Sequence, residues 1–252
     1  MQNPKISIIT VVYNSKLPFA KTLENIIGID YPNKEIIVID GGSTDGTKEV
    51  LEQNSIHIDL WLSEGDNGIY DAMNKALRIA TGEYVWFINA GDLSYAPKVL
   101  ENIFKGTEIY HDIYYGDTLV RSEDGKILGL RKKPLPKTLT PNSLKMGMVV
   151  CHQSFIARRK LLKAFDLKYR HSADYDQMIK AVRAARSIQN VNGILSVFTT
   201  GGYTSQHRID GLKERFTIMR KQFGLWSAIA SHIKIILCAP FMHYRKNKKT
   251  LL

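Results

Sequence analysis

Residues 6–14 read ISIITVVYN, and this stretch decides the fold. From Ile6 to Tyr13 it is a run of apolar, mostly β-branched residues, typical of a strand buried on both faces. Strands of this kind belong to parallel sheets that helices cover on both sides. The stretch therefore predicts the first strand of an α/β sheet.

Outward from this stretch, short apolar runs alternate with helical patterns. The expected strands span residues 36–39, 58–62 and 84–88, and the expected helices span residues 17–27, 44–53 and 70–80. Such alternation predicts a mostly parallel, doubly wound α/β sheet in the N-terminal region of the chain.

The pattern changes after Asp92. Two of the following strands are joined by a hairpin turn at Glu123–Gly125, which predicts a small antiparallel element. The expected strands span residues 113–115, 119–121, 127–130, 151–157, 188–191 and 194–198, and the expected helices span residues 158–164 and 175–185. We expect one continuous domain over residues 1–204 and a helical tail over residues 205–252.

The 252 residues carry a formal net charge of +11, most of it in the tail. Residues 205–252 hold ten Lys or Arg against Asp210 and Glu214, a charge of +8, which suggests an anionic partner. The two cysteines, Cys151 and Cys238, lack metal-ligand spacing, so free thiols in a reducing compartment are expected. The N-terminus has no signal-peptide pattern, and no apolar run reaches the roughly 18 residues of a membrane span.

Two carboxylates stand where an α/β sheet binds ligands, outside the carboxyl ends of its strands, and a third stands at the start of an expected helix. Asp40 begins a glycine-rich turn, DGGSTDG (residues 40–46), and can accept hydrogen bonds from a base or ribose. The alternative is an Asx-type turn that caps the next helix. Neither a P-loop nor a dinucleotide fingerprint is present, which removes the main support for an NTPase or a dehydrogenase.

The other two carboxylates follow later elements. Asp92 ends the turn NAGD (residues 89–92), an oxygen-rich place to hold Mg²⁺ or Mn²⁺ on a diphosphate. Asp174 lies where a helix is expected to start, so the helix dipole would keep it ionised as a general base. A helix N-cap is the competing interpretation of Asp174.

These residues, in this order, resemble the family 2 glycosyltransferases of the GT-A fold, among them bacterial enzymes of exopolysaccharide and O-antigen assembly. The matching segments are ISIITVVYN (6–14), IDGGSTDGT (39–47), SEGDNGIYDAMNK (63–75), GEYVWFINAGD (82–92) and ADYD (173–176). The resemblance implies an inverting hexosyltransferase of class EC 2.4. It would move a sugar from a nucleotide-sugar donor, UDP-sugar favoured, to a glycan or lipid-linked acceptor in surface polysaccharide assembly.

The same resemblance implies a nucleotide-sugar half over about residues 1–95, an acceptor half over about residues 96–204, and a set of site residues. Asp92 would coordinate the divalent cation, Mn²⁺ or Mg²⁺, and Asp174 would be the catalytic base with Asp176 in reserve. The implied donor-binding residues are Thr10, Val12, Tyr13, Asn14, Asp40, Asp66, Asn74, Asn89 and Asp92.

The chain departs from the family pattern at two motifs. Asn89 and Gly91 stand where carboxylates are common, which implies weaker metal binding, mainly through the donor phosphates. Ala173 stands where Glu is common before the base. His152, in CHQS (151–154), looks like a residue of the acceptor side; it could bind an acceptor or a phosphate, or be a satisfied core histidine.

The end of the tail predicts a peripheral membrane anchor. Apolar residues recur at helical spacing over residues 223–237, and Arg245, Lys246, Lys248 and Lys249 follow. We expect a cytoplasmic protein on the inner face of the cell membrane. A helix packed on the catalytic domain or in a homodimer is the alternative.

Other classes of function remain as alternatives. A non-catalytic nucleic-acid-binding or membrane-binding protein would fit the basic charge, but a nucleic-acid site would need interleaved aromatics or a reading motif. A sugar nucleotidyltransferase would need a glycine-rich loop with Arg near the first strand. A non-catalytic partner protein would fit the substitutions at Asn89 and Gly91.

Overall fold

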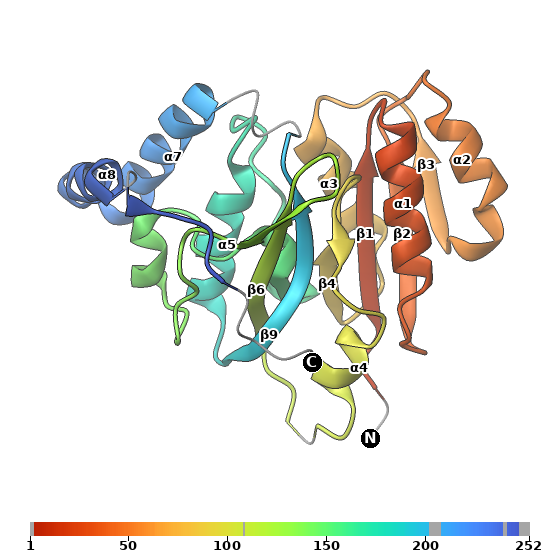
Figure 1. The fold of residues 1–252 in the computed structure, drawn as a ribbon, viewed down its shortest axis with the longest axis horizontal. Coiled ribbons are helices and arrows are strands. Elements are labelled where there is room, and N and C mark those ends of the chain that lie inside the picture. Colours follow the sequence, from red (N-terminus) through yellow and green to blue (C-terminus); the bar gives the residue numbers. More distant parts are fainter. Residues whose placement is uncertain (1–2, 108, 202–207, 239–240, 247–252) are drawn as a thin grey trace.

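The computed structural model describes residues 3–107, 109–201, 208–238 and 241–246. Within these ranges a single mixed sheet crosses the molecule, with helices on both faces (Figure 1). The strands are β1 (Ile6–Val12), β2 (Lys34–Asp40), β3 (Leu60–Ser63), β4 (Tyr84–Phe87), β5 (Leu93–Ser94), β6 (Ile113–Arg121), β7 (Ile127–Leu130), β8 (Phe155–Arg158) and β9 (Ile188–Thr199). The helices are α1 (Lys16–Ile27), α2 (Thr47–Gln53), α3 (Ile69–Ile79), α4 (Val99–Phe104), α5 (Ala173–Ala184), α7 (Arg208–Phe223) and α8 (Leu225–Cys238).

The strand order is β3-β2-β1-β4-β8-β6-β9-β5, with β7 beside β6. β1 is parallel to β2 and β4, and β2 is parallel to β3, so the predicted parallel half is confirmed. β8 is antiparallel to both β4 and β6, which joins the two halves into one sheet. β7 makes the predicted antiparallel hairpin with β6.

Alternate residues of β1 face two separate cores because side chains along a strand point to opposite faces. Ile8 lies in the core with α1 and α4, while Ile9 lies in the core with α3 and α5. All seven residues of β1 are buried. The apolar stretch that predicted this strand is thus the centre of the sheet.

Between residues 151 and 164 the structure corrects the start of one predicted strand and replaces one predicted helix. The strand expected from Cys151 begins only at Phe155, because Ser154 turns its hydroxyl to the Asp117 carbonyl, 2.9 Å away, and to the Ser196 hydroxyl, 2.7 Å away. The helix expected over residues 158–164 is a single 3-10 turn, Arg159–Leu161. Arg158 instead extends β8, and its backbone N–H donates to the carbonyl of Asp112.

Other boundaries differ because tertiary contacts override local pattern. The strands expected at 113–115 and 119–121 are one strand, β6, with a register irregularity around Gly116. A Cβ on Gly116 would lie 2.8 Å from the Gly193 carbonyl oxygen, so glycine allows the neighbouring strand this close. The segments 188–191 and 194–198 likewise form one strand, β9. α4 and β5 were not predicted.

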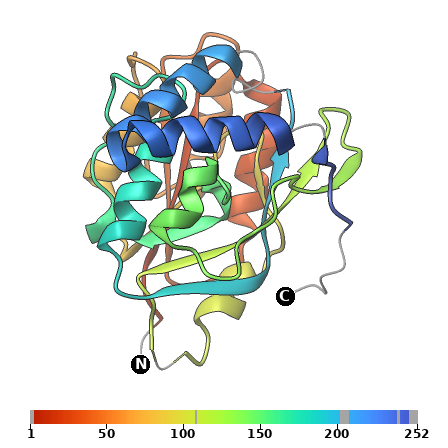
Figure 2. The same ribbon diagram turned by 90° about the vertical axis from the view of Figure 1, so that its left-hand side faces the viewer.

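The tail contributes to the core of the catalytic unit. Ile218 and Met219 of α7 are buried in the same core as α5. α8 lies along α7 on the outside of the molecule (Figure 2). None of the helices within the described ranges has the length and hydropathy of a membrane crossing.

The basic cluster of the tail is only partly as expected. Arg245 was expected in the basic cluster of a membrane anchor, but its guanidinium lies 2.6 Å from the buried Asp117 carboxylate, and its backbone pairs with Leu130. Burial of Asp117 makes this pairing necessary, because an unpaired buried charge is costly. Lys246 is exposed, and Lys248 and Lys249 lie outside the described residues.

At the end of the sheet where the parallel strands begin, the buried carboxylate of Glu35 connects three segments of the chain. It accepts hydrogen bonds from the Ser7 hydroxyl, from Thr81 and from the backbone N–H of Gly82, and Lys5 lies 2.6 Å away. Burial by itself raises the pKa of Glu35, but the hydrogen bonds from Lys5, Ser7 and Thr81 outweigh it and hold the pKa at about 2.

We expect Glu35 to stabilise the fold most at neutral pH. Because its pKa is lower in the folded state, its contribution is complete above the ordinary value of 4.5 and is lost as the pH falls towards about 2. Denaturation of Glu35→Gln should therefore show a loss of about 3 kcal/mol at pH 7 that shrinks towards pH 2. Glu49→Gln, at an exposed position of α2, is the control; an equal loss at both pH values for Glu35→Gln would contradict the assignment.

Candidate active site

A cavity of about 580 Å³ opens where β1, β4 and β9 end, and it brings both halves of the sheet together. Its wall includes the residues after β1 and β4, the start of α3, the 3-10 turn His152–Ser154, the start of α5 and one residue of α7. Four of the predicted site residues line it: Asn89, Asp92, His152 and Asp174.

Asp92 is held by residues from the second half of the chain. Its carboxylate accepts hydrogen bonds from the Gln153 amide, at 2.6 Å, and from the backbone N–H of Thr199, at 3.3 Å. The Gln153 amide oxygen in turn accepts from the Cys151 thiol, which fixes the orientation of the amide. Burial raises the pKa of Asp92 to about 6, against the lowering effect of Gln153 and His152.

His152 forms a line of polar contacts between the two halves. Its Nε2 lies 3.2 Å from the Asn89 amide nitrogen, and its Nδ1 lies 3.4 Å from Asp174 Oδ2. An amide nitrogen can only donate, so Nε2 accepts and Nδ1 carries the proton that faces Asp174. His152 is therefore a member of the site and not an isolated core histidine.

Asp174 lies in the first turn of α5 and remains ionised. Its carboxylate accepts from the Tyr70 hydroxyl at 2.9 Å and from the backbone N–H of Tyr175 at 2.8 Å. Burial raises the pKa of Asp174, but His152, the charge of Arg215 and the Tyr70 hydroxyl outweigh it and hold the pKa below its usual range. The side chain can accept a proton at neutral pH.

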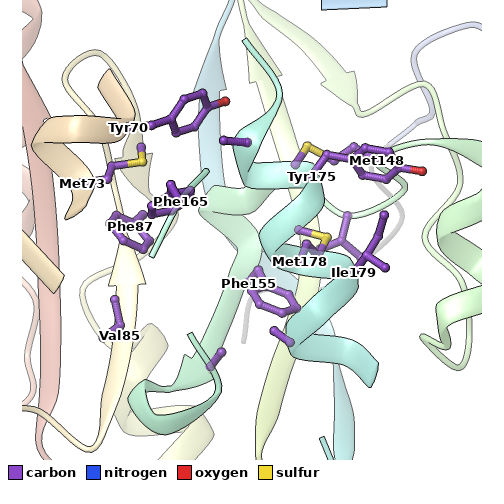
Figure 3. Close-up of a cluster of buried hydrophobic side chains, with 14 of the residues drawn as sticks. Tyr70, Met73, Val85, Phe87, Met148, Phe155, Phe165, Tyr175, Met178 and Ile179 are labelled. Atoms are coloured by element: carbon purple, nitrogen blue, oxygen red, sulfur yellow. The ribbon is translucent and has the colours of Figure 1, made fainter. Parts of the chain in front are cut away.

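An aromatic cluster under the cavity fixes Tyr70 in place. Tyr70 stacks on Phe165 with ring centres 5.3 Å apart, and Phe87 meets the edge of Phe165 at 5.7 Å (Figure 3). Met178 of α5 is buried in the same core. The cluster joins α3, β4 and α5, so the Tyr70 hydroxyl has a rigid base.

Asp40 lies at the predicted strand end, but it does not line this cavity. Its carboxylate is fully buried and accepts from the hydroxyls of Ser43 and Ser63 and from the Ser43 backbone N–H. Asn14 joins the same network: its backbone N–H donates to the Ser43 hydroxyl, and its side chain accepts from Thr44. Asp40 and Asn14 thus hold the ends of β1, β2 and β3 together.

Beside this network, the surface carries Tyr13 and Asp66. Tyr13 is 64% exposed, and Asp66 accepts from the backbone N–H of Gly68. Gly41 lies between them, since a Cβ there would be 2.5 Å from Asp66 Oδ2 and 3.3 Å from the Tyr13 ring. The glycine is needed because the two side chains approach the backbone so closely.

The remaining predicted residues lie behind the site. Thr10 is fully buried and donates to the Ile88 carbonyl, and Val12 is almost fully buried. The Asn74 amide bonds both backbone groups of Phe165, which holds that residue against α3. Asp176, the reserve base, is buried away from the cavity wall, paired with Lys180 and bonded to Gln222.

Sequence reasoning missed several cavity residues from the second half of the chain. Gln153 was within a quoted motif, and a polar side chain next to His152 was the signal that could have indicated it. Arg215 was counted only as tail charge. The additional cavity residues with polar side chains include Tyr70, Arg121, Arg131, His171 and Arg215.

The turn at residues 89–92 fits a divalent cation that receives most of its ligands from elsewhere. Asn89 Oδ1 is buried and has no hydrogen-bond partner among the described residues, and Asp92 is a carboxylate in the same turn. Oxygen ligands of this kind suit Mg²⁺ and Mn²⁺. No cluster of three or more His, Cys, Asp or Glu side chains suited to a metal occurs in the described ranges, so phosphate and water would complete the coordination.

Comparison with known proteins gives relatives over most of the chain. The family "Glycosyl transferase family 2" matches residues 7–165. A PGL/p-HBAD biosynthesis glycosyltransferase of Mycobacterium bovis is 30% identical over 193 residues, covering 71% of this chain and 70% of the relative. The putative glycosyltransferase EpsE of Bacillus subtilis is 27% identical over 218 residues, covering 84% of this chain and 73% of EpsE.

Solved structures share the fold at lower identity. S. aureus TarS residues 1–349 in complex with UDP-GlcNAc match with a TM-score of 0.68 and 20% identity over 92% of this chain and 71% of that chain. The mannosyltransferase PcManGT from Pyrobaculum calidifontis, in complex with GDP-Man and Mn²⁺, matches with a TM-score of 0.60 and 18% identity over 94% of this chain and 76% of that chain. With the family match over more than half of its length, the chain belongs to glycosyl transferase family 2, and it is a glycosyltransferase of class EC 2.4 with the GT-A fold.

Proposed function

We propose that the chain is an inverting glycosyltransferase that moves a sugar from a nucleotide-sugar donor to a glycan or lipid-linked acceptor in surface polysaccharide assembly. The observation that carries the proposal is the single cavity lined by both Asp92 and Asp174. These carboxylates come from different halves of the chain and are linked through the His152 turn. Asp92 acts at the leaving diphosphate, and Asp174 acts on the acceptor hydroxyl.

The donor of first choice is a UDP-sugar. TarS was solved with UDP-GlcNAc and PcManGT with GDP-Man, and the TarS complex has the higher TM-score. The nucleoside lies at the ends of β1 and β2, where Tyr13 and Asp66 provide an exposed ring and a carboxylate. Asp40 and Asn14 shape this surface from behind, as do Thr10, Val12 and Asn74.

Asp92 and Asn89 are the residues that would hold a divalent cation. When bound, the cation neutralises the charge of the departing diphosphate. Asp92 is kept in position by Gln153 and Thr199, so its carboxylate does not need to reorient when donor arrives. Its buried setting strengthens any charge interaction made there.

Asp174 takes the proton in the displacement. The acceptor oxygen bonds to the anomeric carbon as the bond from that carbon to the nucleoside diphosphate breaks, and the acceptor proton passes to the carboxylate. His152 and Tyr70 keep Asp174 ionised and oriented beforehand. A single displacement of this kind inverts the anomeric centre.

The donor and the acceptor are assigned to successive parts of the chain. We assign about residues 1–95 to the donor and about residues 96–204 to the acceptor, with the boundary of the tail among residues outside the described ranges. The free thiols of Cys151 and Cys238 are compatible with a reducing compartment, so we place the protein in the cytoplasm.

The same proposal includes peripheral binding to the inner face of an anionic membrane through α8. The helix turns its small residues Ala228 and Ser231 inward and leaves Trp226 81%, Ile233 54% and Leu237 66% exposed. Lys234 is exposed on the same helix. An exposed apolar helix face with a cation beside it suits the interface of a membrane with anionic lipid.

Donor binding is tested by thermal unfolding with UDP-, GDP- and dTDP-sugars in the presence of Mn²⁺. A donor at about 100 times its Kd should stabilise the fold by about 2.7 kcal/mol. Asp92→Ala should lose the Mn²⁺-dependent component of this stabilisation, while Asp30→Ala, an exposed aspartate at the other edge, should keep it. Equal Mn²⁺-dependent stabilisation in Asp92→Ala would contradict the metal assignment.

The base is tested by UDP release from the donor in the presence of a membrane extract of the producing cells. Asp174→Asn should lower kcat about 10²- to 10⁴-fold with donor affinity unchanged, because it removes proton transfer only. Asp176→Asn should keep kcat and lose stability, since its carboxylate pairs with Lys180 and Gln222. The reverse result would make Asp176 the base.

Membrane binding is tested by flotation with vesicles of phosphatidylglycerol and phosphatidylcholine. The wild type should float with anionic vesicles in a salt-sensitive manner, and the triple variant Trp226→Ser, Ile233→Ser, Leu237→Ser should not. Ile56→Ser, at another exposed apolar residue, is the matched control. Absence of wild-type flotation, with a dimer that the triple variant dissociates, would show that this face binds a second copy instead.

A further inference from the structure

The cavity wall beyond Asp174 carries two arginines that the proposed donor site does not use. Arg131 follows β7, and Arg215 lies on α7. Both belong to the region of the chain after the parallel half of the sheet. Their side chains meet at the same cavity although they lie 84 positions apart in the sequence.

α7 is docked so that Arg215 has to face the cavity. The preceding residue, Glu214, accepts the backbone N–H groups of Arg170 and His171, both at 2.8 Å. One turn later, Ile218 and Met219 are buried against α5. With both sides of the helix fixed, Arg215 is held beside the start of α5, where its charge lowers the pKa of Asp174.

Arg131 is held with similar firmness. One guanidinium nitrogen donates to the Met148 carbonyl at 2.8 Å. The carbonyl of Arg131 accepts from the Arg245 guanidinium, which is itself paired with Asp117. The C-terminal segment thus supports the backbone from which Arg131 reaches the cavity.

Both arginines keep buried donor groups without an acceptor. Arg131 Nη1 and Arg215 Nε are enclosed and have no hydrogen-bond partner among the described residues. Buried donors are nearly always satisfied, because an unsatisfied donor has lost its hydrogen bonds to water without replacement. Such groups are expected where a ligand supplies the acceptor atoms.

A third cation makes the local positive charge greater. Lys133 donates to the Met146 carbonyl at 2.7 Å and lies outside the cavity wall. Burial, followed by the charges of Arg131 and Arg215, lowers the pKa of Lys133 to about 8. Two arginines on the cavity wall, with a third cation near enough to respond to their charges, favour a ligand with at least one full negative charge.

We propose that Arg131 and Arg215 form a subsite for a phosphate group on the acceptor, next to the base. The proposal rests on the proposed function, since it assumes that Asp174 faces the acceptor hydroxyl. An Arg fork matches the oxygens of a phosphate and makes charge-assisted hydrogen bonds to them. The subsite would fix the acceptor so that its hydroxyl lies at Asp174, and it selects acceptors that carry phosphate near the reacting sugar.

The position of the arginines favours the acceptor over the donor diphosphate. The donor surface, with Tyr13 and Asp66, belongs to the ends of β1 and β2, and the metal turn follows β4. Arg215 interacts with Asp174, and in an inverting displacement the base and the leaving group lie on opposite faces of the sugar. A phosphate beside the base is therefore on the acceptor side.

The subsite is tested by titration calorimetry of the full chain with inorganic phosphate, in EDTA to exclude metal-bridged binding. We expect saturable binding by the wild type, at least about tenfold weaker binding by Arg215→Gln, and an intermediate value for Arg215→Lys, which keeps the charge but loses the fork. Arg220→Gln, at an exposed position on the same helix, is the matched control. Acetate should bind more weakly than phosphate because it carries less charge.

UDP binding with Mn²⁺ separates this subsite from the donor site. Arg215→Gln should bind UDP as the wild type does; a parallel loss of UDP and phosphate binding would assign the arginines to the donor and overturn the proposal. Unchanged phosphate binding in folded Arg215→Gln would also overturn it. Failure of UDP binding in the wild type would instead count against the proposed function alone.

The source of the phosphate is distinguished by competition. Soluble glycerol phosphate and vesicles of phosphatidylcholine with phosphatidic acid are each added to the phosphate-bound protein. Displacement by glycerol phosphate supports a soluble acceptor, and displacement by the vesicles supports a lipid-borne one. Displacement by neither would overturn the assignment to an acceptor.

Discussion

The site depends on one line of hydrogen bonds in which His152 joins the end of β4 to the start of α5. Asn89 follows β4 and Asp174 lies in α5, and among the described residues that line the cavity only His152 makes polar contacts with both. Its orientation is set by the 3-10 turn that Ser154 anchors to Asp117 and Ser196. The turn His152–Ser154 directly precedes β8, in a segment expected to continue that strand. In this turn His152 lines the cavity.

The turn His152–Ser154 contacts both carboxylates of the cavity, Asp92 through Gln153 and Asp174 through His152. The pKa values of these two carboxylates are shifted in opposite directions. Burial raises the pKa of Asp92 to about 6 because its few donors do not offset it. At Asp174, His152, the charge of Arg215 and the Tyr70 hydroxyl outweigh burial and hold the pKa below its usual range. Environments that push two pKa values apart are a common way to give similar side chains different roles. A carboxylate with few donors gains most from a cation, and one with many donors stays charged without it.

The sequence predicted the strands and site residues that depend on local pattern, and it missed those whose positions depend on contacts between distant segments. β1 to β4 were predicted because each is a short, mainly apolar run, and Asp92 and Asp174 because each stands at the end of an element. Gln153 and Arg215 could not be placed, because their positions depend on contacts such as Ser154 to Ser196 and Glu214 to the backbone of Arg170. Asp40 was placed correctly at its strand end, but sequence could not show that serine hydroxyls occupy its carboxylate.

The helices α7 and α8 connect the proposed acceptor subsite at Arg215 with the proposed membrane-binding face. α7 is packed firmly on the catalytic unit, because Glu214, Ile218 and Gln222 each contact the part that holds Asp174 or Asp176. α8 packs on α7 through its small residues, so its larger apolar side chains remain outward. An acceptor bound at Arg215 and a surface bound by α8 would thus be held in a fixed relation by one rigid helix, which is the geometry that an enzyme needs when its acceptor is anchored at an interface.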